Sequence, residues 1–114
     1  MPIDKVVYEK LKEVAREQTV IPYSQLNIVC RLKLDLSKIK DRNELARILG
    51  EISEFEVLHG RPMLSAVVVL KDQRPITPAY GFFTYADELG VRKKGESDTA
   101  LFARQLQECF TKWK

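Results

Sequence analysis

Apolar residues recur at the three- and four-residue spacing of an amphipathic helix in three parts of the chain. The pattern predicts helices over residues 4–17, 42–59 and 98–112. Asp4 and Ser97 stand at the starts of the first and last of these helices, and both residue types accept hydrogen bonds from the free amides of a helix start. The longest apolar stripe consists of Leu45, Ile48, Leu49, Ile52, Phe55 and Leu58.

The helix over 42–59 has sequence signals at both ends. Asp41 followed by Glu44 resembles a capping box, in which each side chain satisfies free backbone amides. Gly60 suits the left-handed residue that ends many helices, and Pro62 prevents the helix from continuing. Gly50 lies inside the helix and costs about 1 kcal/mol relative to alanine. We therefore expect another element, most simply a helix, to pass close to Gly50.

Other segments have strand patterns. Residues 19–21 precede Pro22, which cannot donate to a sheet, so they predict a short edge strand. Residues 64–70 are almost wholly apolar and predict a strand buried on both faces. Between these strands, Ser24 is a cap for a short helix over 24–31. The alternation over 32–40 fits either a strand or a turn that leads into a helical piece.

The order of these elements predicts an α+β fold, a winged-helix-like helix-turn-helix with a small antiparallel sheet and an additional C-terminal helix. Residues 71–75 form an exposed turn that corresponds to the wing. The predicted domain covers 1–90 and is followed by a basic linker over 91–96. Residues 97–114 form an amphipathic helix that packs on this domain or on a second subunit. The alternative is a plain α+β domain in which the start of helix 42–59 is merely solvated.

Composition narrows the class of protein. The chain has 114 residues, of which 45% are hydrophobic and 31% charged, as in an ordinary soluble globular domain. No apolar run approaches the roughly 20 residues that a membrane helix needs. Cys30, Cys109 and His59 are too few for a structural zinc site, which takes about four ligands. We expect reduced thiols, a cytoplasmic location, and neither metal nor cofactor.

The distribution of charge suggests a partner. The net charge is only +3, but basic residues gather before and within the first turns of helix 42–59, whereas the second half of that helix is acidic. A winged helix inserts this end of its third helix into the major groove, where arginine pairs with guanine, asparagine with adenine, and lysine with phosphate. The sequence thus predicts a non-enzymatic protein that binds double-stranded DNA through Lys38, Lys40, Arg42, Asn43, Arg47, Lys71 and Arg74.

Two strings carry a resemblance to a known family. The string TVIPYSQL at 19–26, with GRPMLSAVVVLKD at 60–72, resembles the C-terminal DNA-binding domain of alkylguanine-DNA alkyltransferases and alkyltransferase-like proteins. The resemblance covers residues 19–74 and implies a winged-helix fold in which Tyr23 contacts the DNA backbone. The catalytic Pro-Cys-His-Arg motif is absent, so no alkyl transfer is implied. Similar strings occur in small uncharacterised bacterial proteins, which implies no function.

A second hypothesis is a small enzyme. Glu56 and His59 lie three residues apart, so a helix places them on one face, and Arg61 follows shortly after. Glu56 could orient His59 as a general base while Arg61 stabilises an anion. This hypothesis predicts a pocket at the junction of helix and strand that contains all three side chains. The simpler interpretation is that His59 only ends the helix, where a positive charge suits the helix dipole.

A third hypothesis is an interaction module. The helix over 98–112 has a large apolar face and follows the predicted linker, so it could pair with its copy in a homodimer. The face consists of Leu101, Phe102, Leu106, Phe110 and Trp113.

Overall fold

The computed structural model describes residues 3–114 and is mostly helical. The described chain contains the α-helices α1 (Lys5–Arg16), α2 (Tyr23–Val29), α3 (Ile39–Leu58), α4 (Phe82–Glu88) and α5 (Asp98–Lys112). A 3₁₀-helix, η1 (Leu64–Val67), and two strands, β1 (Ile21–Pro22) and β2 (Val68–Val69), complete it.

The prediction of an α+β winged helix with an antiparallel sheet is wrong. The two strands have two residues each and pair in parallel, with Ile21 opposite Val68 and Pro22 opposite Val69. On the other side of β2, Val69 forms one isolated antiparallel bridge to Pro78. Neither proline has an amide hydrogen, so neither pairing extends into a regular ladder.

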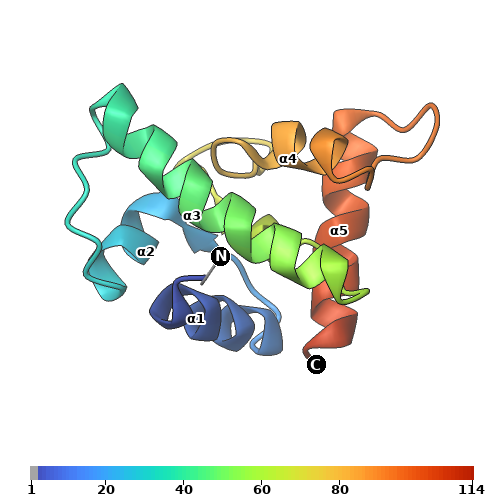
Figure 1. Ribbon diagram of the computed structural model, residues 1–114, viewed down its shortest axis with the longest axis horizontal. Helices are drawn as coiled ribbons and strands as arrows, with labels where there is room; N and C mark the ends of the chain where they lie inside the picture. The colour runs from blue at the N-terminus through green and yellow to red at the C-terminus, as the bar shows by residue number, and fades with distance from the viewer. Residues whose placement is uncertain (1–2) are drawn as a thin grey trace.

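The buried strand predicted over 64–70 is mostly a 3₁₀-helix. Leu64, Ala66 and Val67 have no exposed surface, and only the two residues of β2 extend the segment as a strand. Helices α1, α3 and α5 pack around η1 (Figure 1). A continuous apolar run suits such a central position both as a strand and as a 3₁₀-helix. Hydrophobicity alone could therefore not distinguish these two conformations.

The first and last helices agree with the sequence pattern. Asp4 Oδ1 accepts from the Val7 amide at 3.0 Å, and Ser97 Oγ accepts from the Ala100 amide at 3.2 Å. Helix α3 begins earlier than predicted, because Asp41 lies within its first turn rather than at the cap. The Asp41 carboxylate instead accepts from the Asp35 amide in the preceding loop, at 2.7 Å.

The predicted close approach at Gly50 is confirmed. Helix α4 packs on α3, and the ring of Tyr85 covers Gly50 so closely that a Cβ there would overlap it. At the C-terminal end of α3, Gly60 has a φ of 72°. The amide of Gly60 donates to Val57 and that of Arg61 donates to Glu56, which is the Schellman pattern that Gly60 suggested.

Helix α5 packs on its own domain. Leu101, Phe102 and Cys109 are buried against the core, and α5 contacts η1 and α1. Ion pairs also hold the 91–96 segment to the elements on both sides of it. Arg92 bonds Asp87 at 2.7 Å and Asp98 at 2.7 Å, while Arg104 on α5 bonds Glu96 at 2.8 Å. The apolar face proposed for a dimer is therefore largely occupied within one chain.

Candidate nucleic-acid interface

Two residues predicted to contact DNA, Tyr23 and Arg42, both lie close to the ring of a third residue, Tyr80. The ring centroids of Tyr23 and Tyr80 are 5.4 Å apart with an edge-to-face angle of 71°. The guanidinium carbon of Arg42 lies 5.6 Å from the Tyr80 centroid. All three side chains are half-buried. We call them the Tyr23–Tyr80–Arg42 cluster.

The short strand pairings explain why this cluster forms. Tyr23 directly follows β1, and Tyr80 follows the segment that pairs with the other edge of β2, where the Ala79 amide donates to Val68 at 2.9 Å. Arg42 enters from the first turn of α3. Hydrogen bonding to Tyr80 and partial burial raise the pKa of Tyr23, while the positive charge of Arg42 acts against this rise. These contacts therefore favour the protonated form of the Tyr23 phenol.

The loop between α2 and α3 holds further basic side chains outward. The Asn27 amide group donates to the Leu34 carbonyl at 2.8 Å and accepts from the Leu34 amide at 3.1 Å. Leu32, Leu34 and Leu36 are half-buried, whereas the alternate positions Arg31 and Lys33 are exposed. Both basic residues have positive φ angles, of 53° and 59°, which are uncommon outside glycine.

The other residues at or near the start of α3 that were predicted to bind DNA differ in whether a carboxylate already pairs with them. Lys40 and Asn43 are exposed, and Lys38 lies 4.0 Å from the Asp35 carboxylate. Arg47 instead bonds Glu44 at 2.6 Å and Glu51 at 2.9 Å on its own helix. Hydrogen bonds to these two carboxylates raise the pKa of Arg47 further. Two carboxylates thus neutralise Arg47 locally, which makes it a poor phosphate contact.

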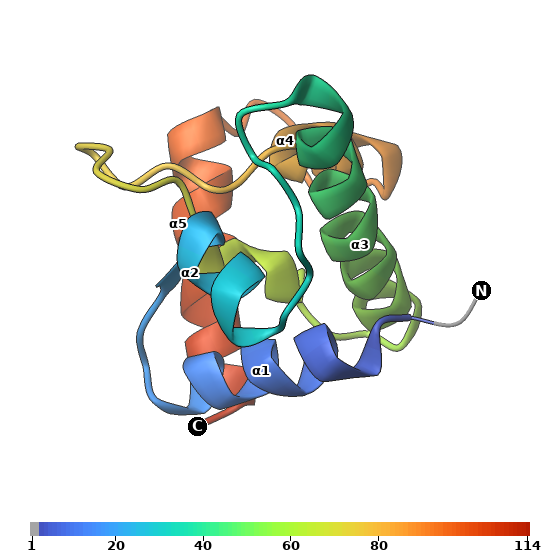
Figure 2. The same cartoon turned by 90° about the vertical axis from the view of Figure 1, so that its left-hand side faces the viewer.

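The predicted wing residues lie apart from the start of α3. Lys71 and Arg74 belong to the stretch over 71–76, in which every residue is exposed. Figure 2 shows this segment projecting on one side of α2 and the start of α3 lying on the other side. The predicted DNA contacts therefore form two groups that flank α2.

Sequence reasoning missed Tyr80. The residue lies in an irregular stretch between Pro78 and Gly81, without the alternation of a strand or the spacing of a helix. Its aromatic character was the only signal, and only the tertiary contacts with Tyr23 and Arg42 distinguish it from the other tyrosines.

The arrangement predicted for an enzyme does not form. Glu56 is fully buried and accepts from Arg61 Nε at 2.9 Å, from Arg61 Nη2 at 3.0 Å and from the Tyr8 hydroxyl at 2.7 Å. His59 is exposed, with its ring 4.4 Å from that of Phe55 and its Nδ1 2.8 Å from the Phe55 carbonyl oxygen. Glu56 therefore orients Arg61 and Tyr8, and not His59. Burial and the bond to Glu56 raise the pKa of Tyr8 to about 12.

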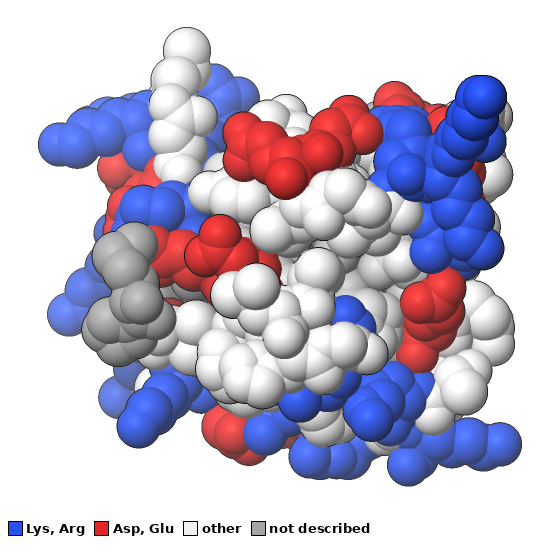
Figure 3. Space-filling view, turned by 45° about the vertical axis from the view of Figure 1, so that its right-hand side comes forward, with Lys and Arg blue, Asp and Glu red and all other residues white. Residues whose placement is uncertain are grey.

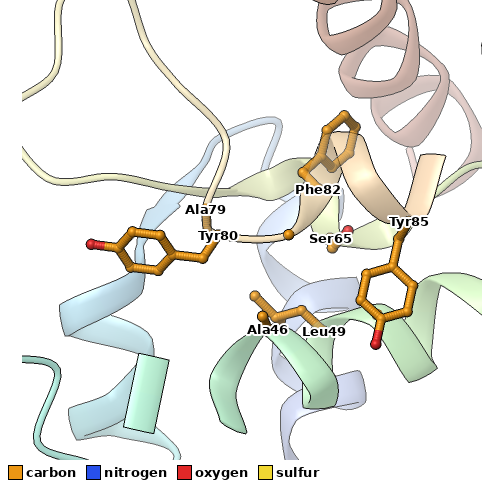
Figure 4. A pocket seen from close by; sticks show the side chains of 9 residues that line it. Ala46, Leu49, Ser65, Ala79, Tyr80, Phe82 and Tyr85 are labelled. Carbon is orange, nitrogen blue, oxygen red and sulfur yellow. The ribbon is translucent and has the colours of Figure 1, made fainter. Parts of the chain in front are cut away.

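A cavity of about 10 Å³ lies between α3, η1 and α4. Figure 4 shows Ser65, Leu49 and Tyr85 at its wall, while the phenol of Tyr80 points away from it. This volume holds about one water molecule. The cavity is thus too small for a substrate.

The second half of α3 belongs to an acidic region. Burial and the carboxylates of Glu88, Glu51 and Glu54 raise the pKa of Tyr85, which lies among them. Figure 3 shows acidic side chains next to basic ones over the face that it presents, without one continuous basic surface. A nucleic acid on α3 would therefore be confined to the first turns of that helix.

No known protein family, curated protein or solved structure matches this chain. Over residues 3–114, no helix is long and apolar enough to cross a membrane. The same part of the chain contains no group of three or more His, Cys, Asp or Glu side chains placed to hold a metal ion.

Proposed function

We propose that this protein binds double-stranded DNA without catalysing a reaction. The surface that we assign to DNA consists of the Tyr23–Tyr80–Arg42 cluster, the exposed basic residues of the 31–40 segment, and the 71–74 turn. The observation that carries the proposal is Arg42, whose guanidinium lies over the Tyr80 ring and has no carboxylate partner within the described residues. An arginine that a ring holds in place loses less side-chain freedom when it binds a phosphate.

The proposed contacts are mainly to the DNA backbone. Phosphates are bound by arginine, lysine and tyrosine side chains, and these contacts position a protein without reading sequence. The cluster supplies an arginine and two tyrosines, and Lys40 lies exposed on the same turn of α3 as Arg42. Binding of this kind releases counterions and weakens as salt increases.

Fluorescence anisotropy with a labelled short duplex tests the proposal. With three phosphate contacts, the affinity should fall about 40-fold when salt increases from about 50 to about 200 mM, because the logarithmic slope is about −0.9 per contact. No binding near 50 mM salt would show the proposal to be wrong.

A charge-matched pair of variants tests the location. Lys40→Ala with Arg42→Ala should weaken binding and flatten the salt dependence by about two contacts. Lys93→Ala with Lys94→Ala removes the same charge from the 91–96 segment, which lies at the opposite end of the molecule in Figure 1. This control should change the affinity little. Equal losses in both variants would contradict the proposed surface.

A further inference from the structure

Helix α2 lies between the two groups of basic residues that the proposed function assigns to DNA (Figure 2). On one side, residues 31–42 contain five basic and two acidic side chains. On the other side, residues 71–74 contain two basic side chains and one acidic side chain. Both flanks are therefore positive, whereas α2 itself, with the sequence YSQLNIV, contains no charged residue. A duplex whose phosphates contact both flanks would thus pass over α2.

The exposed side chains of α2 lie on one face of the helix. Gln25, Ile28 and Val29 are all exposed, and they follow one another at the three- and four-residue spacing of neighbours on a helix surface. Ile28 is 70% exposed. The amide group of Asn27 is already bonded to the backbone of Leu34, so it is not available to a partner. The exposed face therefore combines one amide side chain with two branched apolar ones.

The dimensions of α2 suit the major groove of DNA. An α-helix with its side chains is about 10–12 Å across. The major groove is about 12 Å wide and admits such a helix, whereas the minor groove is only about 6 Å wide. Because phosphates form both walls of the groove, a helix in the groove has phosphates on either side of it. The seven residues of α2 extend for about 10 Å, the length of about three base-pair steps of 3.4 Å.

The chemistry of the exposed face matches A·T base pairs. In the major groove, adenine presents the N7 acceptor and the N6 donor, and a glutamine amide binds both of these atoms at once. Thymine presents its methyl group, which an apolar side chain contacts. Gln25 and Ile28 supply these two side-chain types. They lie about 4.5 Å apart along the helix axis, between one and two base-pair steps.

We propose that α2 reads A·T base pairs in the major groove, with Gln25 bound to adenine and Ile28 in contact with the methyl group of a neighbouring thymine. This inference rests on the proposed function, because the phosphate contacts of the two flanks place the duplex over α2. Phosphate contacts carry no sequence information by themselves. The exposed face of α2 adds a sequence preference to them.

Fluorescence anisotropy with two duplexes of equal length, one alternating A·T and one alternating G·C, tests the preference near about 50 mM salt. The A·T duplex should bind about 5- to 150-fold more tightly, which is the discrimination of one bidentate base contact. Gln25→Ala should remove most of this difference. Gln107→Ala is the matched control, since Gln107 is exposed on α5, and it should preserve the difference.

The same measurement separates the two proposals. Equal affinities of the unmodified chain for the two duplexes would overturn the reading by α2 and leave DNA binding intact. No binding to either duplex would overturn both proposals. Gln25→Ala and Ile28→Ala should keep the affinity of the unmodified chain for the G·C duplex, which also shows that they are folded. Loss of this affinity would instead assign the two residues to backbone contacts and overturn the reading.

Base analogues test the individual contacts. Uracil in place of thymine removes only the methyl group, and it should weaken binding of the unmodified chain about fourfold, as expected for one buried carbon group. Ile28→Ala should bind both duplexes equally. Leu58→Ala should keep the fourfold difference, because Leu58 is 75% exposed but ends α3 far from Arg42. Similarly, 7-deazaadenine removes N7 and should weaken the unmodified chain but not Gln25→Ala. A dependence on the methyl group or on N7 that survives in these variants would overturn the proposal.

Discussion

Replacing Gly50 by alanine should destabilise the protein, although alanine is the better helix former. Gly50 lies within α3 and is buried under the ring of Tyr85 from α4. A Cβ at this position would overlap the Cζ and both Cε atoms of Tyr85. Carbon atoms in contact lie about 3.5–4.0 Å apart, so the ring must move by roughly 1.5 Å.

Two opposing contributions determine the size of the effect. Replacing glycine by alanine in a helix interior stabilises by about 1 kcal/mol. Overpacking a well-packed contact costs about 1–3 kcal/mol, and here it displaces the half-buried Tyr85 ring from α3. We expect a net loss of about 1 kcal/mol in the free energy of unfolding.

A double-mutant cycle isolates the contact with the ring. In a Tyr85→Ala background the overlap is absent, so Gly50→Ala should stabilise by about 1 kcal/mol. The sign change corresponds to a coupling energy of about 2 kcal/mol between the two positions. Urea unfolding followed by far-ultraviolet circular dichroism gives all four free energies. If Gly50→Ala has the same effect in both backgrounds, the contact does not explain the glycine.

Two further predictions concern the buried Glu56. Glu56→Gln should lower the free energy of unfolding, measured by urea unfolding, by about 3 kcal/mol, because it leaves the Arg61 guanidinium without its carboxylate. The control His59→Gln, at an exposed position, should change this free energy by less than about 0.5 kcal/mol. Folding raises the pKa of Tyr8 from 10.0 to about 12. The protonated Tyr8 phenol therefore makes its full contribution to the free energy of unfolding below pH 10, and this contribution is lost as pH rises through 12. Absorbance titration should show a tyrosine transition near pH 12 that Tyr8→Phe removes; a transition that survives this substitution would contradict the assignment.

Local sequence signals were sufficient to predict a helix where its formation depends only on its own residues and on one buried apolar face. Helices α1 and α5 have both a strong apolar stripe and a capping side chain, and their limits lie within one residue of the prediction. The end of α3 was predictable for a similar reason, since Gly60 adopts the left-handed conformation at low cost. Its beginning was not, because the Asp41 carboxylate bonds the Asp35 amide in a loop whose alternating residues fit a strand as well as a turn.

The apparent Glu56–His59 pair shows why a local motif misled. Helical spacing alone places the two residues on neighbouring positions of one face. The left-handed conformation of Gly60 then reverses the direction of the chain. As a result, Arg61 donates its backbone amide to the Glu56 carbonyl oxygen and its guanidinium to the Glu56 carboxylate. A buried carboxylate is stabilised by a charged donor with two parallel bonds more than by a solvated imidazole. Arg61 therefore takes the position that the enzyme hypothesis gave to His59.

By itself, the sequence determined the helices with complete local signals, the burial of residues 64–69 and the solvent exposure of the 71–75 turn. Tertiary structure alone decided that most of the buried run becomes η1, that the strands pair in parallel, and that Tyr80 joins Tyr23 to Arg42. The physical reason is the range of the interactions. Capping and helical periodicity act within a few residues, whereas strand pairing, ring contacts and competition for a buried carboxylate depend on which distant segments the fold brings together.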